Sequence, residues 1–316
     1  MKEILKYSAA ALALCLATFA PVQVQTEIMR VYGSNANDAT HPDAVDVAIV
    51  LAVDVSSSVK RHERRFQREA YAAALSDPAV QRMALGGRTG RVALAYLEWS
   101  GANSQRLHLP MEILSTPEDM AYFAQRIKAI EDTPGDALYV GSTAIGDALI
   151  AAEHAMRGLD VPAREFVIDI SGDGIVNSGT NVPAVRDHLV SIGLTVNGLP
   201  IRISDEAWDG EDNLPDRVAH FYETCVIGGN GSFHLVADGF AAVRETLIMK
   251  LMLEMADLDG TDRRRIAANW NGQEALPLER VIPALVLQMP NQRDARPEAP
   301  KCAHYERQAS KPFVYP

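Results

Sequence analysis

The chain has 316 residues, 47% of them hydrophobic and 22% charged, which is ordinary for a globular protein with room for one large domain and appendages. Its formal net charge is −11. An acidic surface repels phosphate groups, so the composition argues against nucleic acid and anionic membranes as main partners. It favours cations or basic protein surfaces instead.

The first 20 residues are typical of an export signal. Lys2 and Lys6 precede an apolar run at residues 8–17, which is too short to span a bilayer. A buried N-terminal helix is the alternative interpretation. We therefore expect an exported protein, periplasmic or extracellular, that loses residues 1–20 and has no transmembrane segment afterwards. Residues 21–44 are polar and rich in turn-forming residues, which predicts a flexible lead-in.

Strand-like and helix-like patterns alternate between residues 45 and 256. Residues 45–53 form an almost unbroken apolar run, as in a strand that is covered on both faces. Thr116 and Pro117, followed by two acidic residues, form a typical helix start. In chain order we expect strands at 45–53, 91–99, 105–114, 166–170, 194–201 and 232–237, and helices at 63–75, from Thr116 to Ile130, 144–156, 184–192, 216–226 and 240–255.

Strands that alternate with crossover helices predict an α/β fold with a doubly wound, mainly parallel sheet and helices on both faces. The strands at 91–99 and 105–114 are joined too tightly for a helical crossover, so we expect one antiparallel edge strand. Residues 257–316 contain repeated prolines and predict a partly ordered C-terminal extension. Its apolar stretch at 281–289 would dock onto the domain, and docking onto a partner is the alternative.

Two cysteines remain after removal of the leader, Cys225 and Cys302. An oxidising compartment would allow them to form a disulfide, and two unpaired thiols are the alternative. Pairing does not follow from sequence, so both options stay open.

Oxygen-bearing side chains occur at three points where a strand ends or a helix begins. Asp54, Ser56 and Ser58 follow the first strand at alternate positions, Thr143 precedes a helix, and Asp173 follows a central strand between two glycines. Loops at the carboxyl ends of parallel strands form the ligand crevice of doubly wound sheets. Carboxylate and hydroxyl oxygens suit a hard divalent cation such as Mg²⁺. The pattern therefore predicts a metal site.

These motifs resemble the metal-ion-dependent adhesion site of von Willebrand factor type A (VWA) domains. The resemblance covers residues 45–256, and residues 197–201 and 226–231 further resemble a bacterial, exported, functionally uncharacterised branch of that superfamily. It implies Mg²⁺ or Mn²⁺, with Ca²⁺ as an alternative, bound by Asp54, Ser56 and Ser58. Thr143 would bind directly or through water, and Asp173 mainly through water. A protein partner would complete the coordination with an acidic residue.

Other interpretations compete with this one. Asp54, Ser56 and Thr143 are also good helix caps, and Asp173 is a good turn residue. A metal-assisted hydrolase is the second functional class, and Asp169 is its nearest candidate base. A third interpretation is an ion that only stabilises the fold. We expect an exported, metal-dependent protein-binding domain rather than an enzyme.

The remaining motifs carry less information. The histidines lack the spacing of zinc sites, no phosphate-binding P-loop is present, and Ser57 does not lie in a hydrolase elbow. Residues 204–216 form an acidic loop that contains Trp208. A solvated loop is one interpretation, and a partner contact anchored by Trp208 is the other.

Overall fold

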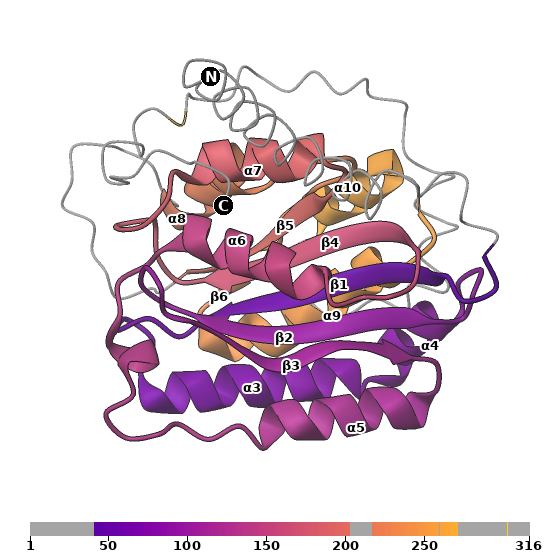
Figure 1. Cartoon of the computed structure of the whole chain (residues 1–316), viewed down its shortest axis with the longest axis horizontal. Coiled ribbons are helices and arrows are strands. Elements are labelled where there is room, and N and C mark those ends of the chain that lie inside the picture. The colour runs from indigo at the N-terminus through magenta and orange to yellow at the C-terminus, as the bar shows by residue number, and fades with distance from the viewer. Residues whose placement is uncertain (1–40, 203–216, 259, 271–301, 303–316) are drawn as a thin grey trace, which may run out of the picture.

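The computed structural model describes residues 41–202, 217–258, 260–270 and 302, and its centre is a six-stranded sheet (Figure 1). The strand order is β3-β2-β1-β4-β5-β6. Neighbouring strands are parallel except for β2 and β3, so the predicted antiparallel edge strand is confirmed. The strands are β1 Val45–Asp54, β2 Val92–Trp99, β3 Gln105–Leu114, β4 Ala163–Gly172, β5 Thr195–Arg202 and β6 Ala237–Asp238.

Two hydrophobic cores lie on opposite faces of the sheet, and β1 contributes to both. Ile49 and Leu51 point into one core, whereas Ala48 and Val50 point into the other. This alternation is the period-two geometry of a strand, and burial on both faces explains the unbroken apolar run. Every residue of β1 is buried.

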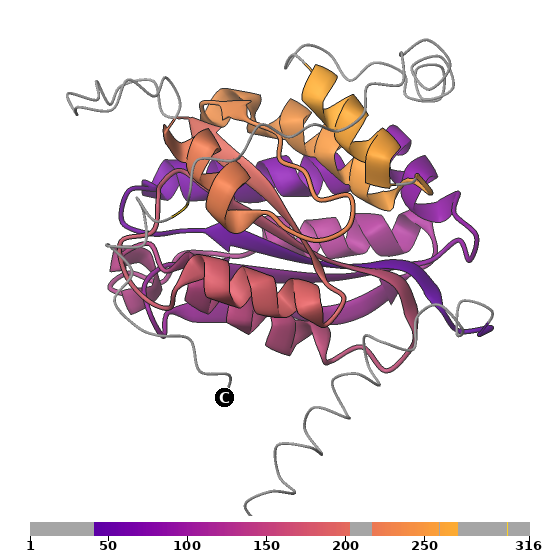
Figure 2. The same cartoon turned by 90° about the horizontal axis from the view of Figure 1, so that it is seen from above.

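Helices cover both faces, and Figure 2 shows α7 on one side of the sheet and α9 with α10 on the other. The first core is covered by α3 Arg61–Leu75, α4 Pro78–Leu85, α5 Pro117–Lys128, the 3₁₀ turn η3 Phe240–Ala242, α9 Val243–Met255 and α10 Gly260–Asn269. The second core is covered by α6 Ile145–Met156, α7 Val182–Ser191, α8 Arg217–Phe221 and the π-helix η2 Tyr222–Val226. The doubly wound α/β prediction is therefore confirmed.

Most predicted elements are present, with four differences. The strand expected at 232–237 is reduced to the two residues of β6 and an isolated bridge at His234. The helix expected at 216–226 divides into α8 and the π-helix. Two helices were not predicted, α4 and α10, and α10 packs Ile266 and Ala267 into the first core. Residues 1–20, Trp208 and residues 281–289 lie outside the described residues.

The structure joins Cys225 to Cys302 in a disulfide, with their Cα atoms 5.4 Å apart. Cys302 packs against the second core. Among the helices of the described residues, none has the length and apolar character needed to cross a membrane.

Three charged side chains are buried together in the first core. Lys250 on α9 forms an ion pair with Asp169 of β4 at 2.6 Å and another with Glu254 on its own helix. The Nδ2 atom of Asn197 donates a hydrogen bond of 2.9 Å to Glu254. Because two carboxylates share one ammonium group away from water, burial and the charge of Asp169 raise the pKa of Glu254 to about 7.

The raised pKa of Glu254 predicts a pH-dependent stability. The folded protein holds the Glu254 proton more tightly than the unfolded chain, so this stabilisation is complete below the ordinary pKa of 4.5 and is lost as the pH rises through about 7. The free energy of unfolding should therefore fall by roughly 3 kcal/mol across this range through Glu254 alone. Urea titrations of wild type and Glu254→Gln at several pH values measure the difference.

Glu245→Gln, at an exposed position of the same helix, is the matched control and should keep the wild-type slope. The assignment is wrong when Glu254→Gln retains that slope as well.

Candidate metal centre

The predicted ligands come together at the carboxyl ends of β1 and β4. These strands are neighbours, and Val53 of β1 lies opposite Ser171 of β4. Asp54 is the last residue of β1, and Asp173 follows β4 directly. The loops that leave both strands therefore emerge at the same edge of the sheet.

Four of the five residues form one chain of hydrogen bonds. The backbone N–H of Ser56 donates to Oδ1 of Asp54 at 2.7 Å. The hydroxyl oxygens of Ser56 and Ser58 are 3.1 Å apart, and Ser58 donates to Oδ1 of Asp173 at 2.8 Å. Asp54 and Ser56 are buried, whereas Ser58 is exposed, so the group opens to solvent on one side.

Thr143 reaches the same place from the start of α6. Its backbone N–H donates to Oδ1 of Asn177 at 2.8 Å, and its carbonyl accepts from the Asn177 N–H at 3.1 Å. A Cβ atom added to Gly174 would lie 3.6 Å from the Thr143 hydroxyl oxygen. The side chain of Thr143 therefore lies against the turn that contains Asp173, and the structure brings all five predicted residues together.

The loop before Thr143 is fixed by close backbone approach. The N–H of Ser57 donates to the carbonyl of Gly141 at 3.0 Å. A Cβ at position 141 would lie 2.4 Å from the hydroxyl oxygen of Ser100 and 2.6 Å from the amide nitrogen of Gly101, so only glycine fits there.

A buried ion-pair network fixes the residues just before this loop. Glu98 of β2 accepts two hydrogen bonds from Arg68 of α3, at 2.6 and 2.8 Å. Arg68 and Arg64 each bond Asp132 at 2.7 Å. Although burial opposes it, hydrogen bonds from His108 and Arg68 lower the pKa of Glu98. The segment that leads to Thr143 is thereby attached to the helix that follows Asp54.

The alternative roles as helix caps are wrong for three residues. Helix α3 begins after Lys60, so neither Asp54 nor Ser56 caps it. Helix α6 begins after Ala144 and has no side-chain cap, so Thr143 does not cap it either.

The site concentrates negative charge away from water. The carboxylate of Asp54 is fully buried, and its Oδ2 atom has no hydrogen-bond partner within the described residues. Burial, and then the nearby charge of Asp173, raise the pKa of Asp54 well above its ordinary value. Two carboxylates and three hydroxyls with a buried, unpartnered oxygen are a donor set that fits a hard divalent cation.

The described residues contain no group of three or more histidine, cysteine or acidic side chains that could hold a metal. A cation here would depend on the hydroxyls as well as on the two carboxylates. Asp169, the candidate base of the hydrolase alternative, is fully buried and paired with Lys250 in the core.

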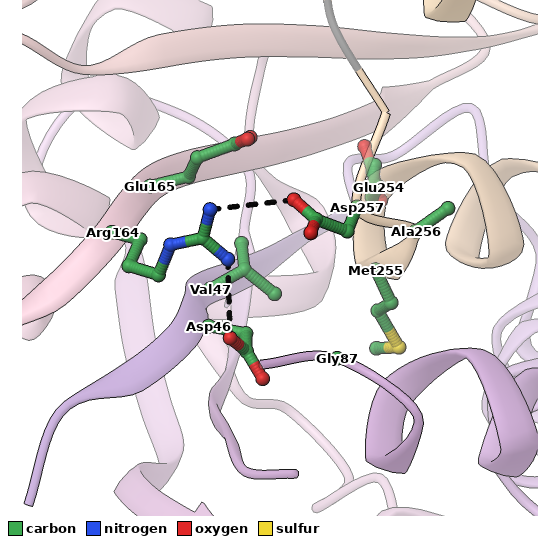
Figure 3. Close-up of a pocket in the computed structure, with 9 residues that line it drawn as sticks. All are labelled: Asp46, Val47, Gly87, Arg164, Glu165, Glu254, Met255, Ala256 and Asp257. Carbon is green, nitrogen blue, oxygen red and sulfur yellow. Dashed lines mark hydrogen bonds and ion pairs between the residues drawn. The ribbon is translucent and has the colours of Figure 1, made fainter. Parts of the chain in front are cut away.

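A small pocket lies at a different place, beside the start of β1 and the end of α9 (Figure 3). The Arg164 side chain lies between two carboxylates there, 3.3 Å from Asp46 and 3.3 Å from Asp257. The guanidinium of Arg164 is thus already paired with carboxylates of the protein itself.

Sequence reasoning did not identify two residues at the site. Asn177 holds Thr143 by two hydrogen bonds, and its place four residues after Asp173 in a turn-rich loop was the only signal available. Tyr222 also lies near Asp54. A Cβ atom added to Gly172 would be 2.7 Å from the hydroxyl oxygen of Tyr222 and 2.9 Å from Oδ2 of Asp54, so Gly172 separates the two side chains. No local pattern marked Tyr222, because it comes from a distant helix.

A family described as a protein of unknown function (DUF1194) matches residues 44–259. The chain belongs to this family. The match begins with β1 and ends after α9, so it includes all the residues of the candidate site. Among curated proteins no match was found.

Solved structures with a similar fold include proximal thread matrix protein 1 from the mussel byssus, with 16% identity and a TM-score of 0.47 over 67% of this chain and 48% of that chain. Another is the pilus adhesin SpaC from Lactobacillus rhamnosus GG, with 12% identity and a TM-score of 0.48 over 67% of this chain and 31% of that chain. The chain thus spans less than half of either structure, and neither likeness carries an argument about function.

The buried Asp54 charge predicts a stabilising mutation in metal-free buffer. Asp54→Asn should keep the hydrogen bond from Ser56 while removing a buried negative charge beside Asp173. In EDTA at pH 8 we expect its free energy of unfolding to exceed that of wild type by on the order of 1–2 kcal/mol. Urea titration measures it.

Asp43→Asn is the control, because the Asp43 side chain is 63% exposed, and it should leave the stability unchanged. A metal-free Asp54→Asn protein that is less stable than wild type would contradict the electrostatic interpretation.

Proposed function

We propose that this protein is an exported, metal-dependent protein-binding domain. Asp54, Ser56 and Ser58 bind the cation, Mg²⁺ or Mn²⁺ with Ca²⁺ as an alternative. Thr143 binds it directly or through water, and Asp173 binds it mainly through water. The observation that carries the proposal is the buried, unpartnered Oδ2 of Asp54 beside the charge of Asp173. A buried charge of this kind is costly unless a cation offsets it.

The arrangement favours binding over catalysis. Ser57 and Ser58 are exposed at the open side of the site, where another molecule can approach. Two carboxylates provide two negative charges, and the remaining ligands are neutral hydroxyls or water. A divalent cation held in this way keeps a coordination position for an acidic side chain of a protein partner, and its local field makes that contact strong. The candidate base Asp169 lies in the core, where it serves no reaction at this site.

Export is supported by two features. The apolar run near Lys2 and Lys6 is typical of a signal peptide, and the Cys225–Cys302 disulfide suits an oxidising compartment. A periplasmic or extracellular location follows from both.

Calorimetric titration of Mg²⁺ and Mn²⁺ into the purified protein tests the site. Wild type should bind one ion, and Asp54→Ala should bind none, because it loses the buried carboxylate. Ser57→Ala is the matched control: it lies in the same loop, its exposed side chain is outside the proposed ligand set, and its affinity should stay within about twofold of wild type. A folded wild-type protein that binds no ion would refute the proposed function.

A second measurement separates a partner site from an ion that only stabilises the fold. Acetate is a minimal model of an acidic side chain. In the Mn²⁺-loaded protein it should displace a bound water and lower the water-proton relaxation caused by the ion. Chloride at the same ionic strength should leave the relaxation unchanged. Equal relaxation in the two salts, with Mn²⁺ still raising the melting temperature, would favour the structural ion.

A further inference from the structure

Tyr222 is a fully buried residue whose hydroxyl lies beside the candidate site. Its oxygen has no hydrogen-bond partner within the described part of the chain, and the same holds for Oδ2 of Asp54. Both atoms lie within 3 Å of one point, the position that a Cβ on Gly172 would occupy, at 2.7 and 2.9 Å. Two unpartnered buried oxygens, one a donor and one a carboxylate acceptor, thus face the same small volume.

Two glycines on neighbouring strands create the path for the Tyr222 ring. A Cβ on Gly198 of β5 would lie 2.7 Å from Cδ1 of the ring, and Gly172 of β4 lies under the hydroxyl. Gly198 is paired with Ile170, two residues before Gly172, so both glycines face the second core. The ring therefore extends across β5 and β4 towards β1, where Asp54 lies. Larger residues at either position would block this path.

The π-helix determines where Tyr222 points. Tyr222 is the first residue of η2, and its carbonyl accepts the N–H of Ile227 at 3.0 Å, which is the wider closure of a π turn. Such turns are rare and often occur at functional sites. Cys225, in the same turn, forms the disulfide with Cys302. The segment that carries Tyr222 is thus covalently joined to Cys302.

At neutral pH a tyrosine phenol carries its proton, so the Tyr222 hydroxyl has a hydrogen to donate. A protonated phenol next to carboxylates acts as a hydrogen-bond donor.

We propose that Tyr222 is a positioning residue of the ion site, whose hydroxyl donates to Oδ2 of Asp54 through one bridging water. This inference rests on the proposed function, because it concerns the same cation. Groups that orient metal-binding carboxylates contribute about 10–100-fold to metal affinity. The hydroxyl of Tyr222 holds the buried carboxylate in the orientation that binds the ion.

Tyr222→Phe tests the proposal, because it removes only the hydroxyl. Calorimetric titration of Mn²⁺ should show an affinity lowered about tenfold relative to wild type. Tyr71→Phe is the matched control: Tyr71 is equally buried, but it lies on the other face of the sheet and donates to Ser171 at 3.2 Å. Its Mn²⁺ affinity should stay within about twofold of wild type.

Urea titration in EDTA separates positioning from a structural role. Metal-free Tyr222→Phe should stay folded, with a urea midpoint close to that of wild type, because the variant loses one water-mediated hydrogen bond and keeps the packing of the ring. An unchanged Mn²⁺ affinity in Tyr222→Phe, or equal losses of affinity in Tyr222→Phe and Tyr71→Phe, would overturn the role of Tyr222. Ion binding by wild type would still support the site in either case. Absence of binding by wild type would overturn both proposals.

Discussion

The site depends on the carboxylate of Asp54, whose burial away from water costs free energy when it is charged. Asp54 ends the central strand of the sheet, is fully buried, and lies near a second carboxylate, that of Asp173. The backbone N–H of Ser56 offsets part of the cost on one oxygen, and the other oxygen is left without a partner within the described residues. A fold retains such an arrangement when a ligand of opposite charge compensates it. The proposed cation site follows from this electrostatic constraint.

The surroundings of Asp54 are built to keep its neighbours in place. The Arg68–Glu98–Asp132 network connects β2, α3 and the segment before Thr143, and the backbone around Gly141 allows the loops to approach closely. Rigid elements hold a polar site more accurately than free loops do. The exposed hydroxyls lie at the rim, and the charged atoms lie beneath them. This gradient from buried charge to open polar surface suits a site that engages another molecule.

The buried carboxylates on the two faces of the sheet have different partners. On the face of α9, Lys250 forms an ion pair with Asp169, and burial, followed by the charge of Asp169, raises the pKa of Glu254. On the face of the π-helix, the neighbour of Asp54 is the neutral phenol of Tyr222. The first cluster contains a basic side chain, Lys250, that offsets the charge of Asp169. Asp54 forms no ion pair within the described residues, which supports the proposed cation site at this edge of the sheet.

The sequence by itself determined the mainly parallel sheet, the antiparallel edge strand and the grouping of Asp54, Ser56, Ser58, Thr143 and Asp173, because strand periodicity and strand-end loops are local properties. It missed α4 and α10, and it overextended β6, since packing rather than pattern decides such short elements. Only the tertiary structure paired Cys225 with Cys302 and brought Tyr222 to Asp54. Those contacts join residues far apart in the chain, and the packing of helices on the sheet decides which of them meet.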